Sequence, residues 1–421
     1  MKEGEFMHKC CKIRIYPNQT QIGIIQRNLN GCRFVYNLYL EYNHRIYDTE
    51  GLFLSGYDFS KILTQLKKND ENYFWLKEIS SKAMKDAIMT AEKAYKRFFA
   101  KIGGYPKFRS KKRNPIHSFF FVKDNIKFYC NRKDKKNKIQ LPILGEVRIT
   151  EKDYLPDKSL VTSGRVIYVN NKYYVVFIYS IEPEIYVPHS PGIGLDLGIK
   201  SYATCYREDG KCWSYQSYLK YKRYIELEEK ITDIQRIISK KSEFNYGRLL
   251  NEYFDNHHNE PNETQKNIMK GESYNTSKIR KLRKKLSILY EKRVNYAKDH
   301  ILKMIPGLIQ TRPEYIAIEN LEISNMLEND SNHKLHDLIA KSKWYFFQER
   351  LLNKARESSV EIRYPKKKYF ASSKLCSNCG HKLKSLSLAN RTYHCPECGL
   401  EIDRDLNAAI NLCFMKKYKI A

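Results

Sequence analysis

Four cysteines near the end of the chain have the spacing of a metal site. They form two C-x2-C pairs separated by fifteen residues, Cys376 with Cys379 and Cys395 with Cys398. Four thiolates at this spacing bind Zn²⁺ tetrahedrally and leave no open position for a reacting water. The pattern therefore predicts a structural zinc ribbon at about residues 370–402.

Three acidic residues stand at the ends of predicted elements. Asp196 lies in the apolar strand GIGLDLG, Glu319 ends the apolar strand YIAIE, and Asp405 opens the helix DRDLNAA. A carboxylate in an apolar strand is costly to bury unpaired, although any one of the three alone could be a turn or capping acid. Together they predict a site for two Mg²⁺ or Mn²⁺ ions, with one ion shared by the two aspartates and the second held by the glutamate. Such a pair of ions promotes the in-line hydrolysis of a phosphodiester.

A domain at residues 191–421 must position both groups. Its sequence indicates three short strands joined by turns, then two long, highly charged helices with narrow apolar seams. These helices predict a hairpin at about 217–303, interrupted by an irregular excursion at 242–276 that is rich in Asn, Glu and Gly. The strand before Glu319, the ribbon and a closing helix at about 404–417 complete an α/β domain.

The sequence predicts a different domain at residues 1–190. A strand at 11–16 is followed by residues 20–102, where apolar side chains recur at helical spacing. Alternating strand patterns fill 117–181, and an Asn-Asn pair between the last two strands predicts a hairpin turn. The expected fold class is therefore α+β multidomain: a small, mostly antiparallel β-barrel with a helical insertion, followed by an α/β domain with an inserted zinc ribbon.

The charge of the chain favours a polyanionic partner. Lys and Arg outnumber Asp and Glu 76 to 47, the net charge is +29, and the 33 Tyr and 19 Phe are residues on which unpaired bases stack. A basic protein without such a partner is the alternative. The loop YPKFRSKKR interleaves cations and aromatic residues, which suits a phosphate backbone with stacked bases as well as a solvated loop. Its cations are Lys107, Arg109, Lys111, Lys112 and Arg113.

The sequence also indicates where the protein works. It contains no apolar stretch of about 18 residues, so we expect no membrane-spanning helix and no membrane partner. The N-terminal segment MKEGEFMHKCCK lacks the apolar core of a secretion signal. Of the eleven cysteines, those outside the ribbon show no spacing of a disulfide framework. This usage fits a reducing cytoplasm.

Several motifs carry a resemblance to a known family. GIGLDLGIKS, IAIENL and DRDLNAAINL resemble the three catalytic motifs of RuvC-like nucleases of the RNase H fold. With these motifs stand YFASSKLCSNCG, RTYHCPECG, RIYPNQTQ, CRFVYN and YPKFRSKKR, and together they make nearly the whole chain similar to the TnpB family. These are the OrfB-type proteins of bacterial insertion sequences, which are relatives of the type V CRISPR effectors.

The resemblance implies an RNA-guided DNA endonuclease. Its first domain would be a wedge and recognition lobe that grips a guide RNA and reads a short motif beside the target. Its RuvC domain would cut both strands of guide-matched DNA with Asp196, Glu319 and Asp405, while pairing with the guide reads the sequence. Arg404 would touch substrate phosphate and Asn407 would orient the neighbouring acid, unless both only shape the start of the helix. The expected assembly is a monomeric ribonucleoprotein associated with the nucleoid.

Four other interpretations compete with this one. A compact type V CRISPR effector would share the chemistry but take its guide from a repeat array. A guide-directed repressor that binds without cutting should lack one of the three acids, and all three are present. A zinc-ribbon protein that only binds nucleic acid leaves Asp196 and Glu319 unexplained. A transposase that transfers strands needs other chemistry, such as a tyrosine nucleophile in a His-rich metal site.

Overall fold

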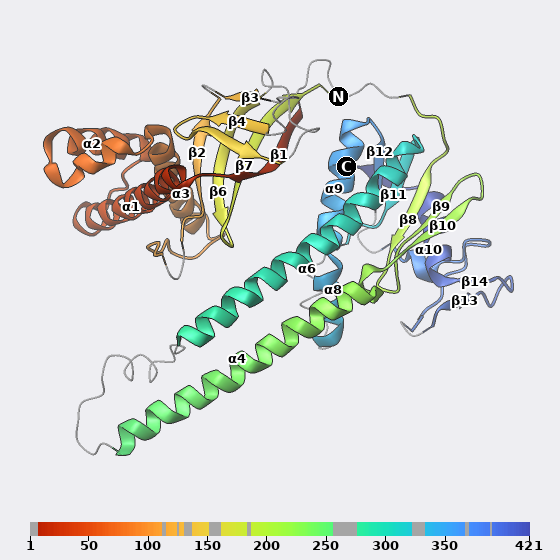
Figure 1. Ribbon diagram of the computed structural model, residues 1–421. Helices are drawn as coiled ribbons and strands as arrows, with labels where there is room; N and C mark the ends of the chain where they lie inside the picture. The colour runs from red at the N-terminus through yellow and green to blue at the C-terminus, as the bar shows by residue number, and fades with distance from the viewer. Residues whose placement is uncertain are drawn as a thin grey trace. The chain divides into compact units, whose positions relative to one another are not determined.

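The computed structural model divides the chain into two compact units, Met1–Glu182 and Pro183–Ala421 (Figure 1). The second unit thus begins at Pro183 rather than at 191, because the last strand of the first sheet already ends at Ile181. We refer to the N-terminal unit and the C-terminal unit and describe each by itself. The described residues are 7–111, 115–123, 126–129, 137–150, 161–182, 187–255, 276–321, 333–366, 370–387 and 390–421.

The N-terminal unit contains a seven-stranded half-barrel sheet in the order β2-β6-β7-β1-β5-β4-β3, in which neighbouring strands are antiparallel. Its first strand begins at Met7, four residues before the predicted start, because Met7 pairs with Ile181. The predicted Asn-Asn turn is confirmed, since Val169 pairs with Lys172 across it. The strands are β1 (Met7–Tyr16), β2 (Ser118–Val122), β3 (Lys127–Tyr129), β4 (Asn137–Leu141), β5 (Gly145–Ile149), β6 (Val161–Val169) and β7 (Lys172–Ile181).

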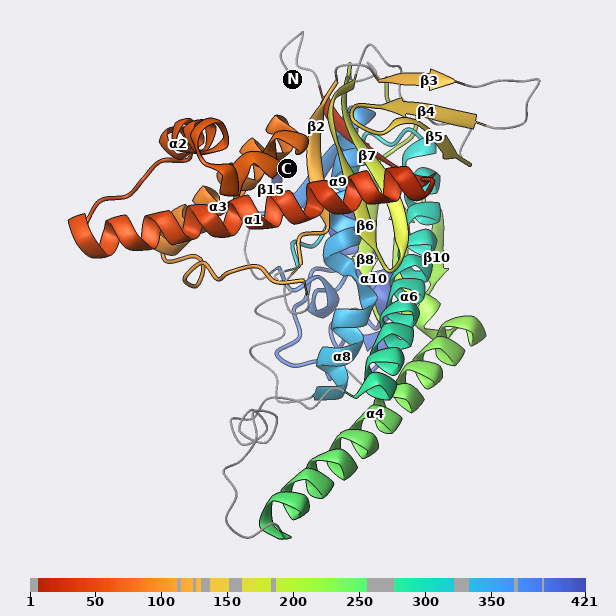
Figure 2. The ribbon, with the colours of Figure 1, turned by 60° about the vertical axis from the view of Figure 1, so that its left-hand side comes forward.

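A group of helices lies between β1 and β2 in the chain (Figure 2). The first of them starts with a capping box, in which Asn18 and Gln21 each satisfy the other's backbone N–H. It ends at Gly51, whose φ of 66° suits a residue without a Cβ. The group buries a core of its own, which includes Tyr39, Phe59 and Ile88. Its members are α1 (Gln19–Glu50), α2 (Gly56–Asn69), the 3₁₀ helix η1 (Glu71–Glu78) and α3 (Ser81–Phe99).

The C-terminal unit is built on a six-stranded mixed sheet in the order β10-β9-β8-β11-β12-β15. The first three strands form an antiparallel meander, β11 and β12 run parallel to β8, and β15 is antiparallel. The strands are β8 (Ile193–Leu197), β9 (Ser201–Arg207), β10 (Cys212–Gln216), β11 (Tyr315–Ile318), β12 (Glu361–Pro365) and β15 (Tyr418–Ile420).

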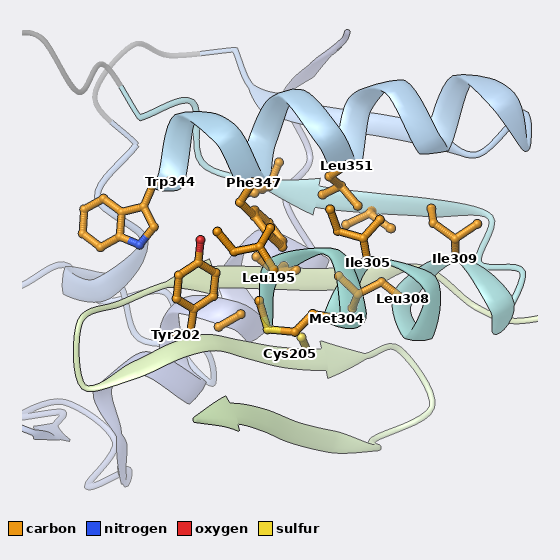
Figure 3. Close-up of a cluster of buried hydrophobic side chains, with 14 of the residues drawn as sticks. Leu195, Tyr202, Cys205, Met304, Ile305, Leu308, Ile309, Trp344, Phe347 and Leu351 are labelled. Carbon is orange, nitrogen blue, oxygen red and sulfur yellow. The ribbon is translucent and has the colours of Figure 1, made fainter. Parts of the chain in front are cut away.

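One face of this sheet carries the main core of the C-terminal unit (Figure 3). Leu195 and Cys205 of the sheet pack against α6 (Ser277–Gln310) and α9 (Trp344–Glu357), which contribute side chains such as Leu308 and Phe347. A shorter helix, α8 (His333–Ser342), precedes α9 and was not predicted. The apolar residues of the strands thus pack against helices on one face of the sheet, and the other face of the sheet is free to carry different elements.

Two long helices, α4 (Lys222–Asp255) and α6, form the predicted hairpin (Figures 1 and 2). Their apolar seams meet at Ile231, Ile234 and Leu289. The excursion predicted at 242–276 is wrong for its first part, because α4 continues to Asp255, and residues 256–275 lie outside the described residues.

The second helix of the hairpin also outlasts its predicted end. It continues through Pro306 to Gln310, since Leu308 and Ile309 are buried in the core and packing outweighs the hydrogen bond that proline cannot donate. Within the described part of the chain, no helix is both long and apolar enough to cross a membrane.

Candidate functional site

The strand β8 has two chemically different faces. Ile193 and Leu195 point into the core, so Gly194 and Asp196 share the opposite face. A Cβ atom on Gly194 would lie 2.0 Å from the carbonyl oxygen of Ala409, which is a residue of α10 (Arg404–Cys413). The glycine therefore lets α10 lie directly on the strand, on the same face as the Asp196 carboxylate.

Glu319 comes to this face through the pairing of parallel strands. Ile318 of β11 pairs with Leu195 of β8, and both side chains lie in the core. The next residues along the two strands, Glu319 and Asp196, therefore lie beside each other and on the opposite face. The register of one strand pair thus brings together two acids that are far apart in the sequence.

Asp405 enters from the first turn of α10. Asp403 caps that helix, and its Oδ1 accepts the backbone N–H groups of Asp405 and Leu406 at 2.9 and 3.0 Å. Across the site, a Cβ atom on Gly198 would come within 3.8 Å of the Asp405 carboxylate. The third acid therefore reaches the end of β8, beside the first two, and the structure brings all three predicted acids together.

Burial and nearby charges shift the pKa values of the three carboxyl groups. Burial raises the pKa of Asp196 well above its usual value, and the charges of Glu319 and Asp405 raise it further. Burial also raises the pKa of Glu319 and of Asp405. Three negative charges close together and partly buried repel one another when no cation is bound. A set of three carboxylates fits a divalent cation.

Two neighbouring residues that the sequence analysis missed hold Glu319 in place. The hydroxyl of Ser372 donates a hydrogen bond to the Glu319 carboxylate and lowers its pKa against the effect of burial. The side-chain amide of Gln348, on α9, donates to the Glu319 backbone carbonyl at 2.9 Å. Ser372 lies in the segment YFASSKLCSNCG, which contributed its cysteines and its family resemblance to the sequence analysis but gave Ser372 no role.

The four predicted ribbon cysteines come together, and their sulfur atoms all lie within 4.8 Å of one another. Cys376 and Cys398 are 3.6 Å apart, and Cys379 and Cys395 are 3.5 Å apart. Zn–S bonds of about 2.3 Å in a tetrahedron place sulfurs about 3.8 Å apart, so the set fits Zn²⁺. Among the described residues, no other group of three or more His, Cys, Asp and Glu side chains is gathered this tightly. The oxygen atoms of the three carboxylates are therefore farther apart than the four sulfur atoms.

The ribbon leads directly into the acidic site. Its short strands β13 (Thr392–His394) and β14 (Glu401–Asp403) pair antiparallel, and β14 continues into α10 (Figure 1). Each cysteine pair is followed by a glycine in the left-handed region, Gly380 and Gly399 with φ of 78° and 71°. The position of Asp405 is thus tied to the folding of the ribbon.

Comparison with known proteins matches three parts of the chain to related families. Residues 7–51 match the OrfB_IS605 helix-turn-helix domain, 179–330 match OrfB_IS605, described as a probable transposase, and 344–412 match the Cas12f1-like TNB domain. The chain is therefore similar to the TnpB (OrfB) family. The first match covers β1 and the whole of one continuous helix, α1, rather than two helices joined by a turn.

Relatives in the TnpB family align along most of the chain. A protein of Streptomyces pristinaespiralis named putative RNA-guided DNA endonuclease is 25% identical over 406 residues, which is 95% of this chain and 87% of that protein. InsQ of Escherichia coli K12, which carries the same description, is 23% identical over 417 residues, with 95% and 90% covered. A cryo-EM structure of a Cas12f1–sgRNA–target DNA complex has the same fold, with a TM-score of 0.50, 13% identity, and 98% of this chain and all of that chain covered.

Two residues of the motif DRDLNAA, Asn407 and Arg404, contact the ribbon. Asn407 is fully buried, its amide donates to the Leu375 carbonyl at 2.7 Å, and its oxygen accepts the Ser377 N–H at 3.0 Å. It therefore ties α10 to the ribbon rather than orienting Asp405. The Arg404 guanidinium donates to the Ser387 carbonyl at 2.9 Å, at the outer side of the ribbon. The expected contact of Arg404 with substrate phosphate stays a prediction.

The basic loop lies in the N-terminal unit. Lys107 and Lys111 are exposed, whereas Arg109 is half-buried with its guanidinium 5.1 Å from the centre of the Tyr36 ring. Lys112 and Arg113 lie outside the described residues. The structure therefore separates one anchored cation, Arg109, from neighbours that face the solvent.

Proposed function

We propose that this chain is an RNA-guided DNA endonuclease of the TnpB type, which cleaves guide-matched double-stranded DNA beside a short flanking motif. The observation that carries the proposal is the meeting of Asp196, Glu319 and Asp405 on one face of one sheet. The two relatives that align along most of the chain are named putative RNA-guided DNA endonucleases, which supports the same activity here.

The topology of the C-terminal unit supports a RuvC-like nuclease domain. An antiparallel meander of three strands is extended on one side by parallel strands, the arrangement expected for an RNase H fold. The first acid lies on β8, in the centre of the sheet, and the second ends β11 beside it. Both are therefore held by the most rigid part of the domain.

The acids would hold Mg²⁺ or Mn²⁺. When bound, these ions activate a water for attack on the phosphodiester and stabilise the leaving oxygen. The part of the protein is to place the carboxylates: β8 and β11 hold Asp196 and Glu319, Ser372 fixes the Glu319 side chain, and the capped turn of α10 presents Asp405. The apolar core beneath the strands keeps this arrangement from shifting.

The cysteine tetrad would hold a structural Zn²⁺. Four thiolates complete a tetrahedral site, so no position remains for substrate. We assign the ion the task of stabilising the ribbon, from which α10 and Asp405 emerge.

The N-terminal unit would act as the wedge and recognition lobe that grips the guide RNA and reads the flanking motif. Its basic loop, with Lys107 and Lys111 exposed, is suited to phosphate contacts. The net charge of +29 would neutralise guide and target backbones in a ribonucleoprotein with one protein chain.

The decisive experiment compares Asp196→Ala with Asp209→Ala, a change of an exposed acid in the β9–β10 turn. Each purified ribonucleoprotein is given a plasmid that matches its guide. We expect Asp196→Ala to cut at least about 10³-fold more slowly than the natural chain, because one of the charge-stabilising groups is gone. The bound RNA should stay the same. Asp209→Ala should cut like the natural chain. Cutting retained by Asp196→Ala would refute the assignment of the acids.

Sequencing of the co-purified RNA tests guidance separately. We expect one defined RNA, with a constant scaffold and a segment that matches the cleaved DNA. Random cellular RNA would contradict a guided enzyme. Defined RNA and target binding without any cutting would instead support the guide-directed repressor.

A further inference from the structure

A cavity of about 170 Å³ in the N-terminal unit has no part in the proposed reaction. It lies where the helices α1 and α3 meet the strands β2 and β6, and Arg109 of the basic loop lines it. Ala87 and Ile116 give it an apolar wall, while Thr90 and Ser118 contribute hydroxyl groups. An apolar pocket with a few convergent polar groups is the usual form of a site for a small, flat ligand.

One end of the cavity carries a fixed pair of opposite charges. The Arg165 guanidinium donates to Oδ1 of Asp86 at 2.7 Å, and a second guanidinium nitrogen is 3.4 Å from the Ser118 hydroxyl. This pair joins α3 to β6 and presents hydrogen-bond donors beside an acceptor to any group that enters. A structural ion pair alone would need no cavity beside it.

A second cation is positioned by an unusual backbone clamp. The Asn37 side chain, on α1, accepts the Arg109 backbone N–H at 2.8 Å and donates to the Arg109 carbonyl at 2.9 Å. This reciprocal pair fixes the loop at one residue and places the Arg109 guanidinium against the Tyr36 ring, 5.1 Å from its centre. The side chains of Arg109 and Tyr36 both line the cavity. A cation already ordered in this way loses little entropy when it binds an anion.

We propose that this cavity binds one unstacked nucleotide, with its base inside and its phosphate at Arg109. The proposal rests on the proposed function, which brings nucleic acid to this unit. An engineered cavity of 150 Å³ accepts benzene, so about 170 Å³ suits a single base better than a base pair. Proteins commonly read splayed bases by their hydrogen-bonding edges and by contact with aromatic side chains or arginine.

The charge pair favours guanine. The Watson–Crick edge of guanine presents one carbonyl acceptor beside two N–H donors, which complements an arginine beside an aspartate. Adenine and cytosine present an acceptor where the aspartate requires a donor, and uracil has one donor instead of two. The nucleotide can come from the guide RNA or from displaced single-stranded DNA, because both offer the same base and phosphate.

Photo-crosslinking tests the pocket on the purified ribonucleoprotein, free and with matched target DNA. Irradiation joins a contacted nucleotide to the protein, and mass spectrometry of the peptides identifies the modified residue, the base and the sugar. We expect a guanine adduct on a peptide that contains Tyr36 or residues 115–118, with ribose or deoxyribose distinguishing RNA from DNA. The Asp196→Ala chain should give the same adduct, so the result does not depend on cutting.

Two variants sharpen the test. Thr90→Phe adds a ring at an exposed position that lines the cavity and should lower the adduct about tenfold or more, whereas Thr64→Phe, the same change at an exposed threonine of α2 that does not line the cavity, should leave it unchanged. Asp86→Asn keeps the shape but replaces one carboxylate oxygen with an N–H donor, and should reduce the preference for guanine about tenfold.

An adduct that persists in Thr90→Phe, or that contains all four bases equally, would overturn the proposal. So would the absence of any adduct at these peptides in an enzyme that cuts guide-matched DNA, in which case the proposed function stands alone. An adduct in the natural chain, if that chain never cuts guide-matched DNA, would support the pocket and count against the nuclease.

Discussion

The cysteine ribbon is followed directly in the chain by Asp405 of the carboxylate cluster, yet the two sites are assembled in opposite ways. The ribbon takes its four ligands from residues 376–398 and gathers their sulfurs within 4.8 Å. The cluster takes Asp196, Glu319 and Asp405 from distant segments and depends on strand register and helix packing to bring them together. The ribbon is therefore a local structure, whereas the carboxylate cluster is a product of the whole C-terminal unit.

The two sites also differ in the interactions that favour or disfavour their folded arrangement. Each ribbon pair ends in a turn that its own glycine makes easy, and Tyr393 is fully buried among the ribbon side chains. In the cluster, burial and the neighbouring acids both raise the pKa of Asp196. The rest of the fold must therefore hold the cluster against its own repulsion. Changes in the ribbon should act on folding first, and changes in the cluster on chemistry first.

The largest effect should follow from Cys395→Ala. Loss of one thiolate leaves the metal site incomplete, so we expect the zinc content to fall from about one ion per chain towards zero and the ribbon to unfold. Because β14 leads into α10, Asp405 should lose its position and cutting should fall about 10³-fold. Zinc analysis, limited proteolysis of residues 376–403 and plasmid cleavage measure the three consequences.

Two matched changes complete this comparison. Cys212→Ala alters an exposed cysteine of β10 and should leave zinc content and cutting unchanged. Asp405→Asn should abolish cutting while the zinc content stays at the natural level. If Cys395→Ala lost its zinc but cut normally, the ribbon would not support the acidic site.

The same contrast explains what could be predicted from the sequence. The spacing of the cysteines and the apolar strands around the acids identified both sites, since each leaves a local pattern. The supports of the cluster left no such pattern: Ser372 and Gln348 contact Glu319 only through the folded chain. Asn407 was expected to orient Asp405, its neighbour in the sequence, but its hydrogen-bond partners lie in the ribbon and are set by the folded chain.

The limits of local pattern also appear in the helices. The Asn, Glu and Gly content of residues 242–276 favoured an irregular excursion, but the segment from 242 to 255 continues α4. Helix α6 passes Pro306 because the buried side chains beyond it outweigh the proline. Tertiary packing decided these element ends, and it is not visible in composition.

A smaller effect, but a more specific one, should follow from Gly194→Ala. The added Cβ would lie 2.0 Å from the Ala409 carbonyl oxygen and 2.5 Å from the Cys413 backbone nitrogen, so α10 must move away from β8. We expect a loss of about 3 kcal/mol in unfolding free energy, together with slower cutting and unchanged zinc content. Gly247→Ala, within α4, meets no atom within 4 Å and should raise stability by up to about 1 kcal/mol. Thermal unfolding and cleavage assays separate the two, and equal effects would show that α10 does not rest on the glycine.

The smallest effect, and the one of opposite sign, should come from Asp196→Asn in buffer without added magnesium. The folded-state pKa of Asp196 is raised, so the ionised carboxylate costs stability, and this cost grows as the pH rises from its ordinary pKa of 3.8 towards the folded value. The neutral amide removes the cost. We expect Asp196→Asn to unfold about 2 °C higher than the natural chain at pH 8, with the gain shrinking as the pH falls towards 4, where both chains carry a neutral side chain. Added magnesium should stabilise the natural chain more than the variant, because the carboxylate is then paired. A variant less stable than the natural chain across this pH range would show that Asp196 is held by favourable contacts, and that the carboxylate cluster stabilises the fold even without bound metal.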